Sequence, residues 1–343
     1  MKLLLKSVPE SVKRIVKKTW AYNLHLRYQL LLRLPYAINL ELTNRCNLSC
    51  NMCPRSDISG LDVGDMDFEL FKKVLDDLRP FIKWNTSLTL VGLGEPLLYP
   101  KLAEAIAYAK TTYPEIPINL STNGVLLDSD RAHALTRLMG QGDFCISVNA
   151  DNPNTYEWLM GSDKFDLVVS NTKQFLSIRK ADRSGQKLKV IIQIMRTKNT
   201  GDTEIREFKK FWAPFMLPHD EVGVKSILNW GGKIPVENFN SPRVKVRRYP
   251  CLELWISMAI DIAGNVYPCC EALTSRKDSS LILGNVRLGA AAQIYLDRID
   301  HFRQAHLRDE QKLIPDCAHC DFYTAYPNVW IRNTLPYTTR RWI

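Results

Sequence analysis

The sequence has 343 residues, 45% of them hydrophobic, and a formal net charge of +10, which is enough chain for a barrel core and a second, smaller domain. Residues 1–36 hold eight Lys or Arg residues and one acid, so they carry +7 of this charge. The rest is nearly neutral, which argues against a nucleic-acid enzyme, because such an enzyme would carry a basic stripe. Nine cysteines, an odd number, without a cleavable signal peptide disfavour a disulfide scaffold and indicate a reducing cytoplasm.

The basic N-terminal segment contains an amphipathic pattern. Val12, Ile15, Val16 and Trp20 fall on one face of a predicted helix, with basic residues opposite. We expect this helix to pack on the outer wall of the main domain, and the alternative is peripheral contact with an anionic membrane. The apolar run at 3–5 is too short for a signal peptide or a membrane span.

Three cysteines form a C-x3-C-x2-C loop, and they indicate a metal site. They are Cys46, Cys50 and Cys53, and thiolates are the soft ligands that select zinc, copper(I) and iron–sulfur clusters. A structural zinc site needs four protein ligands, but residues 30–80 contain no fourth Cys and no His. Three thiolates would instead leave one iron of a 4Fe-4S cube open to a small chelating ligand, so we favour an iron–sulfur cluster over zinc or disulfides.

The loop follows the first of six predicted strand–helix units. Alternating apolar residues over 37–43 predict a strand, and a helix over 68–78 follows, with Asp65 or Asp67 as its cap. The later predicted strands are 87–91, 118–121, 144–148, 188–195 and 222–228. The helices predicted after them are one that begins near Pro100, one over 128–139, helices after 148 that continue to Ala181, and one over 203–215. Repeated strand–helix units predict a parallel sheet with right-handed crossovers, and six units fit an open, partial (β/α)6 barrel in the α/β class.

Polar motifs follow three of these strands, at the edge where the cysteine loop also lies. They are Gly92-Leu-Gly94-Glu95-Pro96, Ser121-Thr-Asn123-Gly124 and Ser147-Val-Asn149. Each motif alone is typical of a turn. Together they offer close backbone approach, a carboxylate for an ammonium group, and hydroxyl and amide groups for a ribose.

Residues 37–230, which contain these motifs, resemble the radical S-adenosylmethionine (radical SAM) superfamily. The resemblance implies that the three-cysteine loop binds a 4Fe-4S cluster whose open iron is chelated by SAM, and that the reduced cluster cleaves SAM to a 5'-deoxyadenosyl radical. It also implies an external flavodoxin or ferredoxin as electron donor. Leu93 departs from the family pattern, where many members carry Gly. The implied SAM contacts are Met52 beside the adenine, Gly94, Glu95 and Pro96 at the methionine ammonium, and Ser121, Asn123, Ser147 and Asn149 at the ribose or carboxylate.

Four later cysteines suggest a second site. Cys251, Cys269, Cys317 and Cys320 surround a predicted hairpin over 256–261 and 266–268. In isolation these four could hold zinc or a cluster. The strings at 264–270 and 283–286 resemble the SPASM and shorter twitch extensions of radical SAM enzymes, including a twitch-type aminocyclitol dehydrogenase, and this implies one auxiliary 4Fe-4S cluster on the four cysteines.

The predicted organisation is therefore a basic segment at 1–36, a partial barrel at 37–235 and a small cluster-binding domain of hairpin and helix at 245–343. A hinge is expected over 235–250, where Pro, Asn and basic residues gather. The alternating pattern gives no sign of repeats or long linkers.

A fully ligated cluster has no open iron and is suited to moving an electron. This favours oxidation of a hydroxyl-bearing carbon in a sugar- or cyclitol-like substrate. The alternatives are a radical epimerase of a sugar or peptide with a thiol hydrogen donor, a SPASM-type peptide-modifying enzyme, and, with less support, a non-enzymatic iron–sulfur carrier.

The remaining chemistry has only candidate residues. Cys270 is the candidate hydrogen donor, whereas Cys145, on a strand, is expected in the core. Arg196 and Glu271 are candidate proton acceptors, although surface charge is the commoner reason for both. Four aromatic residues could line a pocket but are more often core, namely Tyr156, Trp158, Trp230 and Tyr267.

Overall fold

The computed structural model describes residues 34–58, 61–83, 85–239, 250–276 and 279–325. Its strands form a nine-stranded sheet in the order β6-β5-β4-β3-β2-β1-β7-β8-β9. The predicted amphipathic helix at 12–20 and most of the predicted hinge at 235–250 lie outside the described residues.

The first six strands are all parallel, as the sequence predicts. They are β1 Ala37–Leu40, β2 Ser87–Leu90, β3 Ile118–Thr122, β4 Gly142–Asn149, β5 Leu188–Arg196 and β6 Glu221–Ser226. The prediction of six parallel strand–helix units is confirmed. The bounds shift by a few residues, and β1 ends at Leu40 rather than at residue 43.

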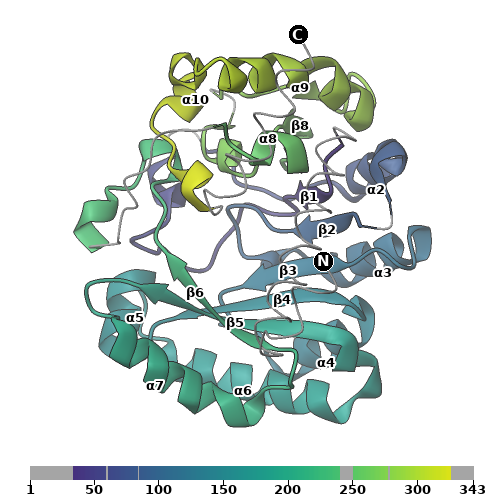
Figure 1. Ribbon diagram of the computed structural model, residues 1–343. Helices are drawn as coiled ribbons and strands as arrows, with labels where there is room; N and C mark the ends of the chain where they lie inside the picture. Colours follow the sequence, from purple (N-terminus) through teal and green to yellow (C-terminus); the bar gives the residue numbers. More distant parts are fainter. Residues whose placement is uncertain (1–33, 59–60, 84, 240–249, 277–278, 326–343) are drawn as a thin grey trace, which may run out of the picture.

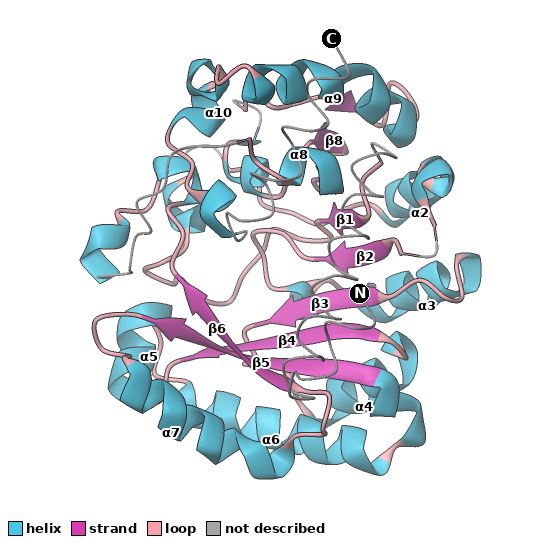
Figure 2. Cartoon of the chain, viewed as in Figure 1, coloured by secondary structure: helices cyan, strands magenta, loops and turns pink. Residues whose placement is uncertain are grey.

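Helices connect these strands and cover one side of the sheet. They are α2 Phe68–Asp77, α3 Leu102–Thr112, α4 Ser129–Met139, α5 Pro153–Met160, α6 Phe165–Ala181 and α7 Asp202–Trp212. Figure 1 shows α4, α6 and α7 outside β4 and β5, and Figure 2 shows the loops that connect helices and strands. The side chain of Asp67 accepts hydrogen bonds from the first-turn amides of α2, so this residue is the cap of that helix.

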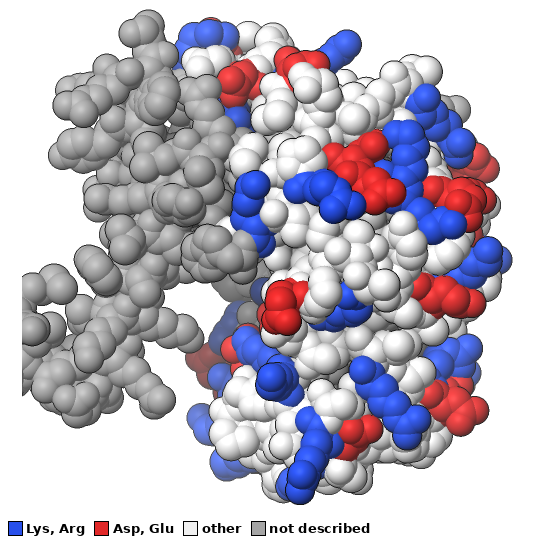
Figure 3. All heavy atoms as spheres, turned by 90° about the vertical axis from the view of Figure 1, so that its right-hand side faces the viewer, with Lys and Arg blue, Asp and Glu red and all other residues white. Residues whose placement is uncertain are grey.

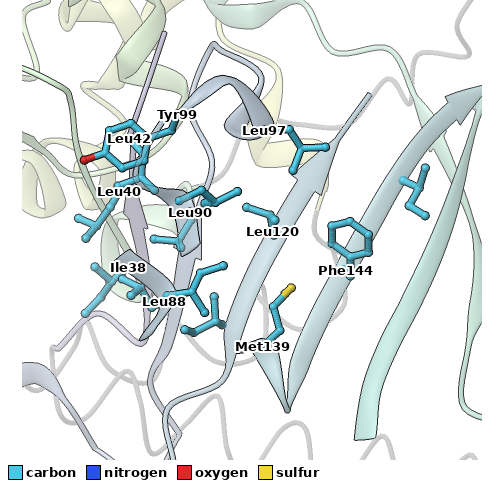
Figure 4. Close-up of a cluster of buried hydrophobic side chains, with 14 of the residues drawn as sticks. Ile38, Leu40, Leu42, Leu88, Leu90, Leu97, Tyr99, Leu120, Met139 and Phe144 are labelled. Atoms are coloured by element: carbon cyan, nitrogen blue, oxygen red, sulfur yellow. The ribbon is translucent and has the colours of Figure 1, made fainter. Parts of the chain in front are cut away.

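The two faces of the sheet differ in polarity because successive side chains of a strand point to opposite sides. One face is apolar and fully buried against the helices. Figure 4 shows part of this core, with Ile38, Leu40, Leu88, Leu90, Leu120 and Phe144 from β1 to β4. The opposite, concave face carries half-buried polar side chains, among them Ser121, Ser147 and Gln193.

The C-terminal region continues the same sheet. Strand β7 (Ser257–Ile260) pairs in parallel with β1, and β8 (Asn265–Tyr267) and β9 (Gly284–Asn285) follow as antiparallel neighbours. The predicted hairpin is confirmed, with Gly264 at φ +88° in its turn. Around it lie α8 (Glu253–Ile256), α9 (Ala291–Leu307) and α10 (Pro315–Ala318).

Length and hydropathy decide whether a described helix could span a membrane. None of the described helices is both long enough and apolar enough to cross a bilayer. On the face shown in Figure 3, acidic and basic side chains of the described residues lie interspersed.

A buried ion pair fixes α6 against the sheet. The guanidinium of Arg179 donates to both carboxylate oxygens of Asp220, at 2.7 and 2.5 Å, and both side chains are fully buried. The amides of Val190 and Leu217 also donate to Asp220. Burial opposes ionisation, but these hydrogen bonds outweigh it and lower the pKa of the Asp220 carboxyl below its ordinary value.

We expect Asp220→Asn to lower the free energy of unfolding at pH 7 by about 3–5 kcal/mol, because it leaves the Arg179 charge buried without its partner. The contribution of Asp220 should be fully present above its ordinary pKa of 3.8 and should be lost as the pH falls through the lower pKa of the folded state. Urea unfolding at a series of pH values measures both effects. Glu207→Gln, in an exposed pair with Lys210, is the control and should leave the midpoint unchanged, and an equal loss in both variants would contradict the prediction.

Candidate active site

The cysteine loop lies directly after β1 and forms one wall of a large cleft. This cleft has a volume of about 1030 Å³. Its walls are the loop with Cys46, Cys50 and Cys53, the carboxyl ends of β2 to β6, and the segment 319–324 from the C-terminal region. The carboxyl ends of parallel strands share one edge of a sheet, which is why residues far apart in sequence meet here.

Contacts from α5 hold the cysteine loop in place. The side-chain amide of Asn51 donates to the backbone carbonyl of Trp158 at 2.6 Å, and the backbone amide of Asn51 donates to the carbonyl of Leu159 at 3.0 Å. Gly161, which ends α5 at φ +63°, packs so closely that a Cβ would lie 2.5 Å from the Ser49 carbonyl oxygen. The loop is therefore built against the end of a helix.

The three thiols lie in a buried environment that disfavours their charged form. Burial, together with the neighbouring thiols Cys53 and Cys46, raises the pKa of Cys50 to about 12. Burial also raises the pKa of Cys46 and of Cys53. At neutral pH these thiols hold their protons until a metal displaces them. Three sulfur donors that lie close enough to interact electrostatically, on the wall of an open cleft, fit a cluster with one exposed iron.

Glu95 braces the loop after β2 against the end of β3. Its carboxylate is almost fully buried and accepts hydrogen bonds from the Thr122 hydroxyl at 2.7 Å, from the Asn123 amide at 2.7 Å and from the Leu97 amide at 3.1 Å. Burial raises the pKa of this carboxyl, and the three donors oppose the shift. The sequence predicts an ammonium acceptor at this position. Glu95 lines the cleft, and its carboxylate also accepts these three hydrogen bonds from the chain.

Gly94 is required by a close approach of two backbone segments. A Cβ at this position would lie 2.4 Å from the carbonyl oxygen of Thr43 and 2.5 Å from that of Arg45. The next amide, of Glu95, donates to Arg45 at 2.7 Å. The loop after β2 thus lies directly on the chain that leads into the cysteine loop.

Two asparagines also tie the cleft wall together. The Asn123 side chain donates to Asn47 in the cysteine loop at 2.9 Å. Asn149 has a φ of +65° next to an irregularity in β4, and its side chain accepts a hydrogen bond from Gln193 at 2.9 Å and donates to Met160. Both amides position neighbouring elements besides facing the cleft.

Seven of the eight predicted SAM contacts line the cleft. They are Met52, Gly94, Glu95, Ser121, Asn123, Ser147 and Asn149. Pro96 does not line the cleft and is buried at the start of a 3-10 turn. The sequence reasoning missed Gln193, Met195, Lys225 and Ser226, which line the cleft from the ends of β5 and β6. For Gln193 and Met195, which lie two residues apart on β5, strand alternation was the signal that could have found them.

The segment after β6 bridges the two groups of cysteines. The amide of Asn229 donates to Asp321 at 3.1 Å, and its side chain donates to the carbonyl of His319 at 2.6 Å. The adjacent Trp230 donates from its indole nitrogen to the carbonyl of Met52 at 3.1 Å. One short segment therefore contacts both the first cysteine loop and the Cys317–Cys320 turn.

The four later cysteines line one common cavity, here called the four-cysteine cavity. Cys251, Cys269, Cys317 and Cys320 all belong to its wall. Burial raises the pKa of Cys320 to about 12 and raises the pKa of Cys251 and Cys269 well above the ordinary value. Four buried thiols around one cavity fit a fully ligated cluster. Among the described residues, no three His, Cys, Asp or Glu side chains converge as the ligands of a single metal ion.

Cys320 belongs to both sites. It lines the four-cysteine cavity and also the cleft that contains the first cysteine loop. The two sites therefore share a wall.

The structure does not bring the candidate proton acceptors into the cleft. Arg196 falls on the opposite face of β5 from Gln193 and Met195 and pairs with Asp202 at 2.8 Å. Glu271 lines the four-cysteine cavity instead. Burial, with Glu253 and Asp321, raises the pKa of Glu271 to about 8 and Lys233 opposes this, so the group holds its proton at neutral pH.

Neither of the two spare cysteines belongs to the described lining of the cleft. Cys270 is half-buried at the start of the 3-10 turn Glu271–Thr274 and lines neither the cleft nor the four-cysteine cavity. Cys145 was expected in the core, but it lies on the concave polar face of β4, where its thiol donates to Gln193 at 3.8 Å. The correction follows from strand alternation, because Phe144 and Ile146 take the buried face.

Among the four aromatic candidates, only Trp230 lines the cleft. Tyr156 and Tyr267 are fully buried, and Trp158 packs against Phe239 with ring centroids 5.4 Å apart. These three belong to the packing of the fold.

Comparisons with known proteins agree with this arrangement. The model of the radical SAM superfamily matches residues 40–208, and that of SPASM, an iron–sulfur cluster-binding domain, matches residues 251–321. The S-adenosyl-L-methionine-dependent 2-deoxy-scyllo-inosamine dehydrogenase of Niallia circulans is 29% identical over 146 residues, which make up 39% of this chain and 58% of that protein. The matches cover less than two thirds of the length of the curated relatives.

Solved structures share the fold. The crystal structure of BtrN in complex with AdoMet and 2-DOIA aligns with a TM-score of 0.57 at 20% identity and covers 84% of this chain and 93% of that chain. Streptococcus suis SuiB bound to the precursor peptide SuiA aligns with a TM-score of 0.59 at 15% identity and covers 76% of this chain and 64% of that chain. At these identities the likeness establishes a common fold.

We expect Gly94→Ala to weaken SAM binding about tenfold or more, because the added methyl would displace the loop after β2 from the backbone of Thr43 and Arg45. Equilibrium dialysis with labelled SAM on anaerobically reconstituted protein measures the effect. Gly289→Ala is a matched control, because its Cβ would make only an ordinary contact, 3.7 Å from Ile294. Wild-type affinity in the Gly94 variant, at equal iron content, would contradict the prediction.

Reconstituted protein should hold about eight irons per chain, since each cube contains four. Replacing Cys46, Cys50 and Cys53 together by Ala should leave about four, and replacing Cys251, Cys269, Cys317 and Cys320 should do the same. Iron and zinc analysis of each purified variant measures the counts. Zinc in place of half of the iron would refute the second cluster.

Proposed function

We propose that this chain, which belongs to the radical SAM superfamily and carries a C-terminal SPASM iron–sulfur domain, oxidises a hydroxyl-bearing carbon of a sugar- or cyclitol-like substrate. When bound, SAM and the two 4Fe-4S clusters supply a hydrogen-abstracting 5'-deoxyadenosyl radical and an electron acceptor. In the net reaction the substrate alcohol loses two hydrogens and becomes a ketone. A flavodoxin- or ferredoxin-type protein is the proposed source of the reducing electron.

The shared wall at Cys320 is the observation that carries this proposal. Loss of one hydrogen atom, one proton and one electron is needed to convert an alcohol to a ketone, so an electron acceptor must lie near the substrate. Because Cys320, Phe322 and Tyr323 line both the cleft and the four-cysteine cavity, the two sites are adjacent and a cluster in that cavity would lie next to the cleft. A cavity closed by four thiols suits electron transfer rather than substrate binding.

The polarity of the cleft supports a hydroxylated substrate. Gln193 and Lys225 come from the concave face of β5 and β6, and Ser226 and Asn229 follow at the strand end. Amide, hydroxyl and ammonium groups can donate to several hydroxyl oxygens at once. The similarity to an aminocyclitol dehydrogenase agrees with this substrate class.

Epimerisation receives less support. It needs a thiol that can return hydrogen to the substrate, but Cys270 and Cys145 are both outside the described lining of the cleft. The cysteines that do line it, Cys46, Cys50, Cys53 and Cys320, are the proposed cluster ligands. Dehydrogenation needs no such donor.

A peptide is the second candidate substrate. The fold aligns with that of SuiB bound to its precursor peptide, and a cleft of about 1030 Å³ is wide enough for more than one small molecule. The same radical chemistry would then act on an amino-acid side chain.

We expect anaerobically reconstituted enzyme, SAM and a strong reductant to convert a polyol or aminocyclitol to a ketone, with 5'-deoxyadenosine formed in equal amount. A substrate deuterated at the reacting carbon should transfer its deuterium to 5'-deoxyadenosine, and mass spectrometry detects both products. Failure to cleave SAM under strong reduction would exclude the enzymatic proposal.

The same assay in deuterated water separates the two radical routes. A ketone without solvent deuterium supports dehydrogenation. Solvent deuterium at an inverted carbon, lost in Cys270→Ala, would instead establish epimerisation. Product found only with peptides would move the assignment to peptide modification.

A further inference from the structure

A buried ion pair joins the end of β1 to the C-terminal region. The guanidinium of Arg276 donates to both oxygens of Glu41, at 2.5 and 2.7 Å. The Glu41 side chain is fully buried and that of Arg276 is 11% exposed. The pair links positions 235 residues apart in the chain, so it connects the cluster-binding region to the barrel.

The same carboxylate holds the loop that leads to Gly94. One oxygen of Glu41 accepts a hydrogen bond from the Leu93 amide at 2.9 Å. The preceding residue, Gly92, lies so close that a Cβ would be 2.3 Å from the side chain of Glu41. Gly92 and Gly94 both line the cleft, so the position of Glu41 sets the position of the backbone that faces a ligand there.

Arg276 is in turn part of the wall around the later cysteines. It follows directly after Thr274 and Ser275, which line the four-cysteine cavity. It also lies in the field of Asp261 and Tyr267, which hydrogen-bond to each other at 2.9 Å on the hairpin that leads to Cys269. One side chain thus connects the cluster-binding hairpin with the loop after β2.

The charge and shape of the Arg276 guanidinium fix the orientation of the Glu41 carboxylate. Glu41 is a carboxylate without solvent, and a planar guanidinium that meets both of its oxygens fixes its orientation better than a point charge can. Without Arg276, the hydrogen-bond partners that Glu41 retains among the described residues would be the backbone amides of Leu93 and Ile262. A carboxylate that has lost its cation would turn, take up a proton or draw in water, and each change moves the Leu93 amide.

We propose that Arg276 is a positioning residue for SAM binding: through Glu41 it holds the 92–95 backbone in the conformation that receives SAM, so the cluster-binding region sets the SAM affinity of the barrel. The proposal needs only SAM binding and does not depend on the substrate or on the oxidation proposed above. Coupling between sites on this scale commonly changes affinity by 5- to 150-fold.

The first test compares SAM affinity in Arg276→Met and Arg276→Lys. Arg276→Met should raise the Kd for SAM about tenfold, and Arg276→Lys should fall between it and the wild type, because lysine keeps the charge but not the two parallel bonds. Equilibrium dialysis with labelled SAM on protein of equal iron content gives the values. Arg308→Met, which removes an exposed arginine paired with Glu310, is the control and should bind SAM as the wild type does.

A second readout needs neither cluster nor SAM. Hydrogen exchange measured by mass spectrometry on a peptide covering 88–98 should be faster in Arg276→Met than in the wild type, and unchanged in Arg308→Met. The signal of this peptide includes the Leu93 amide.

The double variant Glu41→Leu/Arg276→Met separates positioning from general stability. It replaces the buried pair by apolar groups and leaves no unpaired charge, so its melting temperature should be higher than that of Arg276→Met. Its SAM affinity should still be low, because the acceptor for Leu93 is gone. If Arg276→Met does not fold, this variant and Arg276→Lys decide the question. Wild-type SAM affinity and wild-type exchange in these folded variants would overturn the proposal.

Discussion

The parallel pairing of β7 with β1 is the constraint on which the rest of the site depends. Four residues of β1 pair in register with Ser257–Ile260, and the amide of Glu41 continues the ladder by donating to Ile260. The first cysteine loop follows β1, and β7 leads into the hairpin whose second strand, β8, precedes Cys269. Because adjacent parallel strands lie about 4.8 Å apart, this pairing joins the cluster-binding region to the barrel within a single sheet.

Strand alternation then decides which side chains can take part in chemistry. On β5, Gln193 and Met195 face the concave side and line the cleft, whereas Arg196 faces outward and meets Asp202 at the start of α7. A shift of one residue reverses the face that a side chain occupies. Proximity to the end of a strand is therefore not enough to assign a residue to the site. The residue must also lie on the face of the strand that points into the cleft.

Local sequence patterns predicted much of the fold and both cysteine groups. Alternation marks the six parallel strands, and cysteine spacing marks the metal-binding loops, because both signals lie within a short stretch of chain. The pairing of β7 with β1 was not predictable in this way, since no local pattern records which strand a hairpin will join. The contact between Glu41 and Arg276 has the same origin, because each residue alone looks like an ordinary charged position.

Another miss has a different cause. Cys145 looked like a core residue because free cysteine is commonly buried, yet the polar interior of this partial barrel gives its concave face a different environment. This error comes from judging a side chain without the neighbours that the sheet supplies.

The short turn after β6 completes the geometry that the sheet begins. Trp230, Gly231 and Gly232 have φ values of +49°, +70° and +91°, a conformation that favours glycine and is uncommon for tryptophan. A Cβ on Gly232 would lie 2.9 Å from that of His319, so the turn packs directly on the segment between Cys317 and Cys320. The indole of Trp230 meanwhile reaches the carbonyl of Met52 in the first cysteine loop. The unusual backbone at Trp230 thus lets two successive residues, Asn229 and Trp230, contact opposite cysteine groups, and this contact keeps Cys320 on the wall of the cleft.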